Sequence, residues 1–497
     1  MPHPSFAPAL ATLLAPPLTV MSALAPIQAQ AQAISPAEAA SLQAQVAALK
    51  AQVESMEARL AAAGLAPTGA PPSGVAPAGV APASSAPARD ASPAATHPAV
   101  AATTPAAAPA DPRPGAAIGW KGSPQITEGD RAFKVKGRIQ ADANYVRAPG
   151  SLGDEGLGFS NEMRRIRLGA EGAIGGGFGY KLELELSDNA VDLVDTYVSY
   201  KHGPWNVKLG NQNPFQSLDE LTGDTSGSVM ERAAFTDAFN FERRLGASVQ
   251  YQRGALLAQA GLFSDDIGAL ANDADGETGG DENNSHGVDA RLVYAPRLGK
   301  TQLHLGGSVH WRDLGRLSQG DTRYRQRPFV HSTNTRLIGT PAMQVASEFN
   351  WGLETAVIRG RWHAAAEYNT LTADRLDAPS VRFQGAYGEL GVFLTPGDSR
   401  GYKEGIFTNK APARPLGSGG FGSLQLTARY DWLDLDDRDI RGGSQQAYIA
   451  ALVWTPVEYL RFNLNYARLA YKGAKALPSG RTDYGANVIG TRFELDF

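Results

Sequence analysis

A repeated alternation of apolar and polar residues between residues 133 and 497 constrains the fold more than any other feature of the sequence. In the first run, Phe133, Val135 and Ile139 fall on one face of a strand, and Lys134 and Lys136 fall on the other. Side chains of a strand point alternately to opposite faces, so the run has one apolar and one strongly polar face. A soluble sandwich would bury its apolar faces in a core, whereas a transmembrane barrel turns them to lipid and keeps its polar faces in water.

About sixteen such segments follow one another, an even number, as bacterial single-chain barrels require. They start near residues 133, 163, 179, 193, 205, 246, 256, 287, 301, 344, 362, 381, 423, 444, 459 and 485. The pattern predicts an all-β fold, a transmembrane antiparallel β-barrel over residues 131–497 with an aqueous lumen. Short and long connections alternate, except that the long 395–422 connection falls on the short-turn side. We therefore expect this connection to fold inward.

Residues 1–33 are apolar, rich in Ala and Pro, and end in a small-residue pattern typical of a cleaved signal peptide. The alternative is an unstructured Ala/Pro tail. Residues 34–63 predict a short coiled-coil helix, because Ser35, Pro36 and Glu38 form a helix start with a capping box. A heptad seam then follows at Leu42, Val46, Leu49, Val53, Met56 and Leu60.

The seam has nothing in its own segment to pack against, so it indicates self-association in the periplasm; the alternative is a lone amphipathic helix on a surface. Residues 64–130 are mostly Ala and Pro and predict an extended linker.

Composition excludes several classes of protein. The 497-residue chain has no Cys, which rules out a disulfide scaffold and thiolate metal sites. Its formal net charge of −4 gives no support for a nucleic-acid partner. No P-loop, HExxH or G-x-S-x-G motif is present, so we expect no enzyme, no cofactor and no metal. The acidic 264–286 segment indicates a solvated extracellular loop rather than a calcium site.

A row of arginines is the sharpest local feature. In an extended chain Arg323, Arg325 and Arg327 share one face and repeat every ~6.6 Å. Guanidinium groups bind phosphate and carboxylate oxygens in pairs and stay charged at any working pH. Such a row can pass an anion from site to site, provided that each site is weak enough to leave. The alternative is a solvated basic loop or a contact with lipopolysaccharide.

Other basic residues are candidates for anion binding in the lumen. In the segment that begins near residue 163, Arg165 and Arg167 are expected to face inward, and Arg164 to face outward or sit at the rim. The remaining candidates are Lys134, Lys136, Arg138, Arg243 and Arg244.

Several stretches of the barrel segment, taken in order, resemble the phosphate-selective porins O and P of Gram-negative outer membranes. They are Arg164-Arg-Ile-Arg-Leu-Gly-Ala-Glu-Gly172, Asp195-Thr-Tyr-Val-Ser-Tyr200, Asn213-Pro-Phe-Gln-Ser-Leu-Asp-Glu-Leu-Thr222, Met230-Glu-Arg-Ala233, Arg325-Gln-Arg-Pro328, Phe393-Leu-Thr-Pro-Gly-Asp-Ser-Arg400 and Ala428-Arg-Tyr-Asp-Trp-Leu-Asp-Leu435. The resemblance implies a homotrimer of sixteen-stranded barrels that passes anions. It also implies that Arg323, Arg325 and Arg327 are an arginine ladder in the fifth loop, and that Arg164 and Arg165 are paired wall arginines.

The third loop, about 212–245, departs from the family pattern. It holds Arg232, Arg243 and Arg244 but no Lys, so the constriction lysines of the family are not identifiable. The same loop carries six acids: Asp219, Glu220, Asp224, Glu231, Asp237 and Glu242. Phosphate selectivity is therefore open on the sequence alone, as is the question of whether these acids pair with the arginines.

Three functions remain after these observations. The first is a porin of the bacterial outer membrane for passive diffusion of anions, phosphate or polyphosphate, surrounded by outer-membrane lipid and lipopolysaccharide. The second is a structural or adhesive barrel that its coiled coil tethers to peptidoglycan. The third is an outer-membrane enzyme such as an esterase.

Overall fold

The computed structural model describes residues 115–152, 157–267, 285–315 and 322–497. The predicted signal peptide, the coiled-coil helix and most of the predicted linker lie outside these described residues. The wall strands are β3 (Arg131–Arg147), β4 (Gly158–Gly175), β5 (Phe178–Glu185), β6 (Asp192–His202), β7 (Trp205–Gln212), β8 (Arg244–Arg253), β9 (Leu256–Phe263), β10 (His286–Tyr294), β12 (Thr301–Asp313), β15 (Val345–Arg359), β16 (Trp362–Arg375), β17 (Val381–Phe393), β20 (Ser423–Asp437), β21 (Ile440–Val457), β22 (Leu460–Lys472) and β23 (Tyr484–Asp496).

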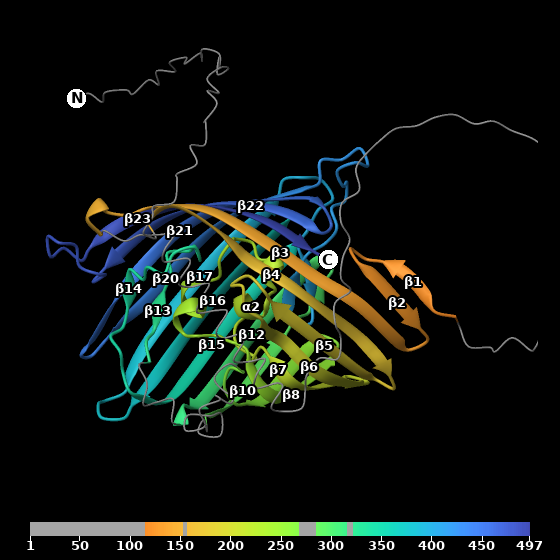
Figure 1. The fold of residues 1–497 in the computed structure, drawn as a ribbon, viewed down its shortest axis with the longest axis horizontal. Coiled ribbons are helices and arrows are strands. Elements are labelled where there is room, and N and C mark those ends of the chain that lie inside the picture. The colour runs from red at the N-terminus through yellow and green to blue at the C-terminus, as the bar shows by residue number, and fades with distance from the viewer. Residues whose placement is uncertain (1–114, 153–156, 268–284, 316–321) are drawn as a thin grey trace, which may run out of the picture. The chain divides into compact units, whose positions relative to one another are not determined.

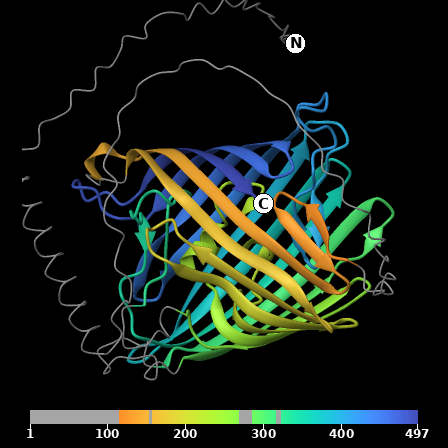
Figure 2. The same cartoon turned by 45° about the vertical axis from the view of Figure 1, so that its right-hand side comes forward.

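The wall closes on itself. The main sheet has 19 strands, and leaving out the short β1, β2 and β11 leaves sixteen wall strands. Each is antiparallel to the next around the wall, and the last strand pairs with the first, from Asn487 beside Arg147 to Asp496 beside Arg138. The ribbon views show these strands slanting around one lumen (Figure 1, Figure 2). The predicted sixteen-stranded antiparallel barrel is confirmed, and the predicted starts at 205, 256, 301, 362, 381 and 423 coincide with the observed ones.

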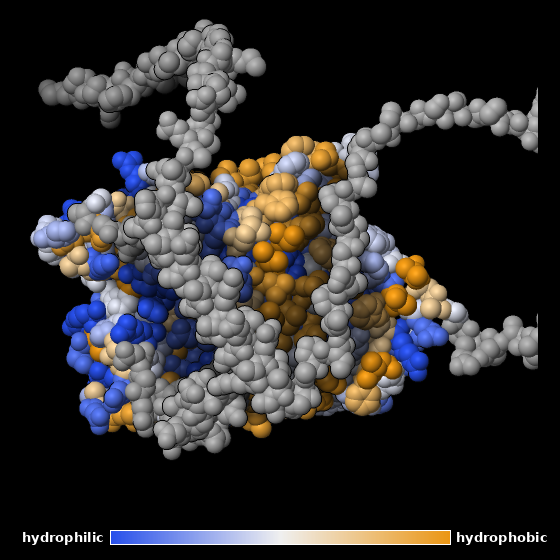
Figure 3. Space-filling model, in the orientation of Figure 1, coloured by the Kyte–Doolittle hydropathy of each residue, from blue (hydrophilic) through white to orange (hydrophobic). Residues whose placement is uncertain are grey.

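The two faces of the wall differ as the alternation predicts. On β15, Phe349 and Leu353 point outward and are 42% and 60% exposed, whereas Glu348 and Asn350 point inward and are 5% and 1% exposed. Figure 3 shows hydrophobic residues over the middle of the wall on the face in view, and hydrophilic residues toward the end on the left. Such a belt is typical of a wall in contact with lipid. No helix within the described residues is long and apolar enough to cross a membrane.

A hairpin precedes the barrel, so the predicted linker ends before residue 130. β1 (Ala117–Trp120) pairs with β2 (Pro124–Glu128), and β2 pairs with the start of β3. Composition placed these residues in the linker, because the Ala/Pro-rich stretch hides the short alternating run from Pro124 to Glu128. The short strand β11 (Arg297–Leu298) pairs with β12 at a turn.

Three connections contain small elements of their own. Loop three (213–243) contains α2 (Leu218–Leu221), η2 (Asp224–Ser226) and α3 (Ala234–Ala238). The described part of loop five (322–343) contains β13 (Arg325–Gln326) and β14 (Ile338–Gly339). The 395–422 connection contains the hairpin β18 (Gly401–Lys403) and β19 (Ile406–Thr408). The only other such element among the described residues is η1 (Gly150–Leu152), after β3.

Apolar residues on the inner side of β17 hold loops three and five inside the barrel. Phe235 of loop three stacks on Tyr387 with ring centroids 6.3 Å apart, and Tyr324 of loop five packs on Phe383 at 5.3 Å. Both Phe235 and Tyr324 are 0% exposed. Each aromatic pair of this kind contributes about 0.5–1.5 kcal/mol beyond its buried area. The core therefore lies within the barrel, between the loops and one side of the wall, and it narrows the lumen.

Candidate functional site

Wall carboxylates fix the two short helices of loop three. Glu367 of β16 accepts hydrogen bonds from the backbone N–H groups of Leu218 (2.8 Å) and Asp219 (2.7 Å). Asp431 of β20 accepts one from the backbone N–H of Ala234 at 3.2 Å. The first N–H groups of a helix have no partner within the helix, and they carry partial positive charge. The two carboxylates satisfy these groups and hold the loop across the lumen.

Asp224 of loop three binds two predicted anion-binding arginines at once. Its Oδ1 lies 2.5 Å from Arg138 Nη1, and its Oδ2 lies 2.9 Å from Arg165 Nε. Arg138 also pairs with Asp496 at 3.2 Å, and Arg165 donates to Gln140 at 2.8 Å. Burial opposes ionisation of Asp224, but the charges of Arg138 and Arg165 outweigh it and hold the pKa of Asp224 well below its usual range. One loop acid thus shares its single negative charge between two arginines.

Arg164 points into the lumen, which corrects the prediction that it faces outward or sits at the rim. The register of β3 and β4 shifts by one residue, because Gln140 is opposite Arg165 and Ala141 is opposite Met163. Arg164 is the extra residue of this β-bulge, so it is free of the alternation. Its Nε lies 4.0 Å from Glu231 of loop three.

Arg167 and Arg243 also lie in the lumen with acidic partners. Arg167 pairs with Glu185 at 2.7 Å and with Glu183 at 3.4 Å. Arg243 pairs with Asp195 at 2.7 Å. The predicted inward direction of Arg167 is confirmed. Each of these guanidiniums would have to share its charge between a wall carboxylate and a passing anion.

Arg244 lies on the inward face of β8 with an acidic partner, and its role in anion binding stays a prediction. Its side chain is 4% exposed and pairs with Asp265 at 2.8 Å, and Arg312 binds the same carboxylate. Two arginines on one carboxylate form a structural cluster at the start of β8. Arg243, its neighbour in the sequence, precedes β8 and pairs with a different carboxylate, that of Asp195.

In loop five, the three arginines of the predicted row alternate along the chain with two buried residues. Tyr324 and Gln326 are 0% and 3% exposed, so they point toward the wall, and Tyr324 donates to Glu348 at 2.5 Å. The alternation puts Arg323, Arg325 and Arg327 on the other side of this segment.

These arginines differ in their surroundings. Arg325 is exposed, and Arg327 lies 3.7 Å from Asp237 of loop three. Loop five continues across the mouth to the first strands, where Ser332 accepts a hydrogen bond from Asn144 at 2.9 Å. The arginine row therefore lies in the loop that crosses the mouth.

The 395–422 connection folds into the barrel from the short-turn end, as its length predicted, and reaches loop three. The backbone N–H of Phe407 donates to Thr222 Oγ1 at 3.3 Å, and Asn409 Nδ2 donates to the carbonyl of Thr225 at 2.6 Å. Arg400 donates to the carbonyl of Ser226. The lumen is therefore narrowed from both ends at one level.

Four cavities follow one another through this narrowed region. The outer cavity, about 190 Å³, lies between loops three and five. A first neck cavity and a second neck cavity of about 40 Å³ each lead to a periplasmic cavity of about 200 Å³ at the short-turn end. Successive cavities share lining residues: Arg232 joins the first two, Arg400 the next two, and Lys410 and Arg461 the last two.

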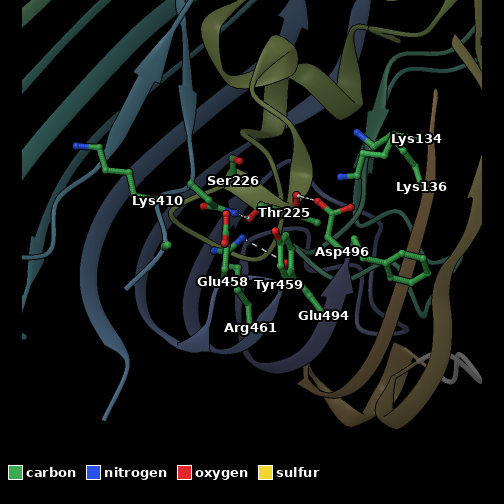
Figure 4. A pocket seen from close by; sticks show the side chains of 13 residues that line it. Lys134, Lys136, Thr225, Ser226, Lys410, Glu458, Tyr459, Arg461, Glu494 and Asp496 are labelled. Atoms are coloured by element: carbon green, nitrogen blue, oxygen red, sulfur yellow. Dashed lines mark hydrogen bonds and ion pairs between the residues drawn. The ribbon is translucent and has the colours of Figure 1, made fainter. Parts of the chain in front are cut away.

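Basic side chains line each cavity. Figure 4 shows Lys134 and Lys136 on one side of the periplasmic cavity and Lys410 on the other. The lining bases are Arg164, Arg232 and Arg327 in the outer cavity, Arg165, Arg232, Arg400, Arg429 and Arg492 in the first neck, Arg400, Lys410 and Arg461 in the second neck, and Lys134, Lys136, Lys410 and Arg461 in the periplasmic cavity. Acids are interspersed, among them Glu220 and Glu231 in the outer cavity.

The candidate set from sequence missed six of these lining bases: Arg232, Arg400, Lys410, Arg429, Arg461 and Arg492. The alternation along the strands predicts that Arg429, Arg461 and Arg492 point inward, but it predicts the same for many other basic residues. These three differ from the others because they contact loop three, and that contact cannot be read from the sequence. Among the described residues no cluster of His, Asp and Glu could hold a metal ion.

Glu220 gives the outer cavity a pH dependence. Burial raises the pKa of Glu220 to about 7, against the opposing charge of Arg232, whose Nη1 lies 3.2 Å from the carboxylate. Below that pH the carboxyl is neutral and Arg232 is less compensated, so we expect chloride preference to increase as pH falls from about 8 to about 6. The reversal potential of the channel in a planar bilayer with a KCl gradient, recorded at pH 8 and at pH 6, measures this chloride preference.

Glu220→Gln should show the low-pH behaviour at both pH values, because the amide cannot ionise. Glu128→Gln, in the β1–β2 hairpin, is the matched control and should keep the wild-type dependence. Equal pH dependence in wild type and Glu220→Gln would contradict this assignment.

Known proteins resemble this chain along most of its length. The sequence profile of the family described as phosphate-selective porin O and P matches residues 133–497. An uncharacterized protein of Caulobacter vibrioides is 60% identical over 411 residues, covering 82% of this chain and 83% of that protein. Porin O of Pseudomonas aeruginosa is 27% identical over 354 residues, covering 65% of this chain and 78% of that porin.

Among solved structures, an anion-selective porin from Comamonas acidovorans is 12% identical with a TM-score of 0.46, covering 74% of this chain and all (100%) of that one. The outer-membrane expressed OmpT of Vibrio cholerae is 10% identical with a TM-score of 0.47, covering 75% and 100%. The match of the family profile to the whole barrel is the decisive finding. The chain belongs to the family of phosphate-selective porins O and P.

Proposed function

We propose that this outer-membrane porin passes small anions by passive diffusion, with phosphate or the end of a polyphosphate chain as its preferred solute. The observation that carries the proposal is the chain of four basic-lined cavities that share lining residues from mouth to periplasmic end. An anion then meets basic side chains at each step, with acids interspersed. In the second neck, where Arg400, Lys410 and Arg461 face the single acid Asp398, the excess of positive charge raises the local concentration of anions and their rate of capture.

The neck sets the size of the solute. Each neck cavity measures about 40 Å³, and a cavity of roughly 10–15 Å³ is just large enough to hold one water. The neck therefore suits one small, partly dehydrated ion. Arginine forks can replace the lost hydration of phosphate oxygens. Larger solutes would require movement of loop three.

The acids of loop three tune how long an anion stays. Conduction needs sites that bind well enough to capture an ion and weakly enough to release it. Asp224 and Glu231 already occupy part of the hydrogen-bonding capacity of Arg138, Arg165 and Arg492. An anion competes with these carboxylates at each arginine, so each site is weak. The row Arg323, Arg325 and Arg327 then serves to collect anions at the mouth.

The remaining parts of the chain complete the proposal. We assign residues 1–33 to a signal peptide, 34–63 to a periplasmic coiled-coil helix that reaches toward peptidoglycan, and 64–130 mainly to a spacer. The barrels assemble as a homotrimer within outer-membrane lipid. Porin families are channel proteins, so an esterase function has no support. The structural alternative is favoured by one observation, the contact between the 395–422 connection and loop three, which narrows the lumen from both ends.

Single-channel conductance in a planar bilayer tests the proposal. With a KCl gradient we expect a reversal potential that favours chloride, and added phosphate should block the chloride current. Arg325→Ala should weaken this block, because an exposed arginine of the collecting row is lost. Arg382→Ala is the matched control, because Arg382 is an exposed arginine on the outer side of β17. Phosphate should block the chloride current of this variant as strongly as that of the wild type.

Each other outcome has its own meaning. A chloride preference without block would indicate a general anion porin. A cation preference would overturn the assignment of the lumen. A correctly folded protein that never conducts would overturn the porin proposal in favour of a structural barrel.

A further inference from the structure

A row of polar side chains crosses neighbouring strands on the outside of the barrel, near the end with the long loops. Arg468 of β22 is directly opposite Asn487 of β23, and Asn487 is directly opposite Arg147 of β3. Residues directly opposite each other in a sheet have their side chains on the same face. At ~4.8 Å between strands, the two arginines flank the asparagine with about 10 Å between their Cα atoms.

The row lies on the outer face of the wall and not in the lumen. The next row toward the membrane centre on the same face is Tyr466, Ile489 and Tyr145, which are 45%, 47% and 48% exposed. The alternate residues, such as Ala467 and Val488, are buried on the inner side. Exposed tyrosines of this kind mark the level where acyl chains give way to headgroups. The two arginines therefore lie at headgroup height in the outer leaflet.

Asn487 is positioned as part of the site. Its Oδ1 accepts hydrogen bonds from Tyr466 Oη at 2.8 Å and from Arg468 Nη1 at 3.3 Å. Both bonds use the carbonyl oxygen, so the amide N–H groups remain available beside the arginines. Gly485 leaves the space for Arg468, because a Cβ at residue 485 would lie 2.8 Å from Arg468 Nη2.

The charges of this row are uncompensated, unlike those of the lumen. Within residues 115–152, 157–267, 285–315 and 322–497, neither Arg147 nor Arg468 forms an ion pair with a carboxylate, whereas Arg375 at the same end of the barrel pairs with Asp439 at 2.7 Å. Two arginines on a lipid-facing surface without acidic partners are costly unless an anion joins them. A phosphate group accepts such paired forks well.

We propose that Arg147, Asn487 and Arg468 bind a phosphate group of the phosphorylated glycolipid of the outer leaflet, lipopolysaccharide. The aromatic row beneath packs against its sugar and upper acyl chains, and the arginines hold the phosphate. The source is a lipid and not a free phosphate, because the row faces away from the lumen. The proposal rests on the outer-membrane location and is independent of what the channel passes.

Binding of lipid A to the purified, detergent-solubilised full chain tests the proposal. Bis-phosphorylated lipid A should bind more tightly than its monophosphorylated form, and zwitterionic phosphatidylethanolamine should bind least. Arg147→Gln together with Arg468→Gln should weaken binding of bis-phosphorylated lipid A about tenfold, the effect of losing one good charge-assisted contact. Arg253→Gln, an exposed arginine at a short turn on the opposite side of the membrane, is the matched control.

Further arms keep the result decisive. Arg147→Lys with Arg468→Lys keeps the charge and should recover part of the binding, which separates loss of the site from loss of the fold. Displacement of lipid A by millimolar inorganic phosphate would overturn the proposal in favour of a free-anion site. Unchanged binding in the double glutamine variant, or a change in its oligomeric state on a native gel, would also overturn it, the latter in favour of an interface between copies of the chain.

Discussion

Replacing Arg492 with Met is expected to lower the free energy of unfolding of the barrel by about 3–5 kcal/mol, the usual cost of removing one partner of a buried ion pair. Arg492 is 2% exposed, and its Nε and Nη2 each lie 2.7 Å from the carboxylate of Asp142. Its Nη2 also binds Glu231 at 2.5 Å, and its Nη1 donates to the carbonyl of Met230 at 2.7 Å. The substitution leaves Asp142 buried without its partner and releases loop three from the wall.

The temperature at which the folded band is lost in an electrophoretic heat-modifiability experiment measures this effect. Arg253→Met, an exposed arginine at a short turn, is the matched control and should melt like the wild type. Adding Asp142→Asn to Arg492→Met should recover part of the loss, because the unpaired buried charge is removed. Equal melting of Arg492→Met and the control would show that the network contributes little.

The same network explains the charge state of Glu231. Burial acts to raise the pKa of Glu231, but the charges of Arg492 and Arg164 outweigh it and hold that pKa at about 2. The stability that this pairing contributes is therefore fully present above the ordinary pKa of a glutamate and is lost only as pH falls toward about 2. The ion pair between Glu231 of loop three and Arg492 of β23 therefore persists throughout the physiological pH range.

The wall was predictable from sequence because one physical rule dictates it. A lipid-facing strand must alternate apolar and polar residues, so β7, β9 and β20 begin where the alternation begins. The rule fails where the chain breaks the period. One extra residue at Arg164 turns that side chain inward, and nothing in the local residue pattern marks the β-bulge.

The candidate site was less predictable than the wall, because its charges are paired over long distances in the chain. Asp224 and Arg138 are 86 residues apart in sequence, and their ion pair exists only because loop three folds inward. Counting bases and acids along strands therefore identified Arg138 and Arg165 but not the acid that occupies them. Conversely, neighbours in the sequence need not share a partner, because Arg243 pairs with Asp195 whereas Arg244 pairs with Asp265.

Replacing Asp224 with Asn is expected to strengthen anion binding at the neck about tenfold. The amide keeps the shape of the side chain but removes the charge shared by Arg138 and Arg165. One unit charge at 4 Å is worth about 4 kcal/mol at an effective dielectric constant of about 20, and only about 1.4 kcal/mol of it is needed for a tenfold change in affinity. Arg138 keeps Asp496, so Arg165 is the group that gains most.

Block of the chloride current by phosphate measures the effect of Asp224→Asn. The concentration for half block should fall, and the reversal potential should move toward that of a purely chloride-selective pore. Asp439→Asn, which removes an exposed acid paired with Arg375 outside the lumen, is the matched control and should leave both quantities unchanged. Since Arg165 lines the first neck cavity and Asp224 lines the same cavity, an unchanged half-block concentration in Asp224→Asn would mean that anions do not pass there. The route would then have to lie outside the neck cavities, and the collecting row of loop five would lead to a different passage.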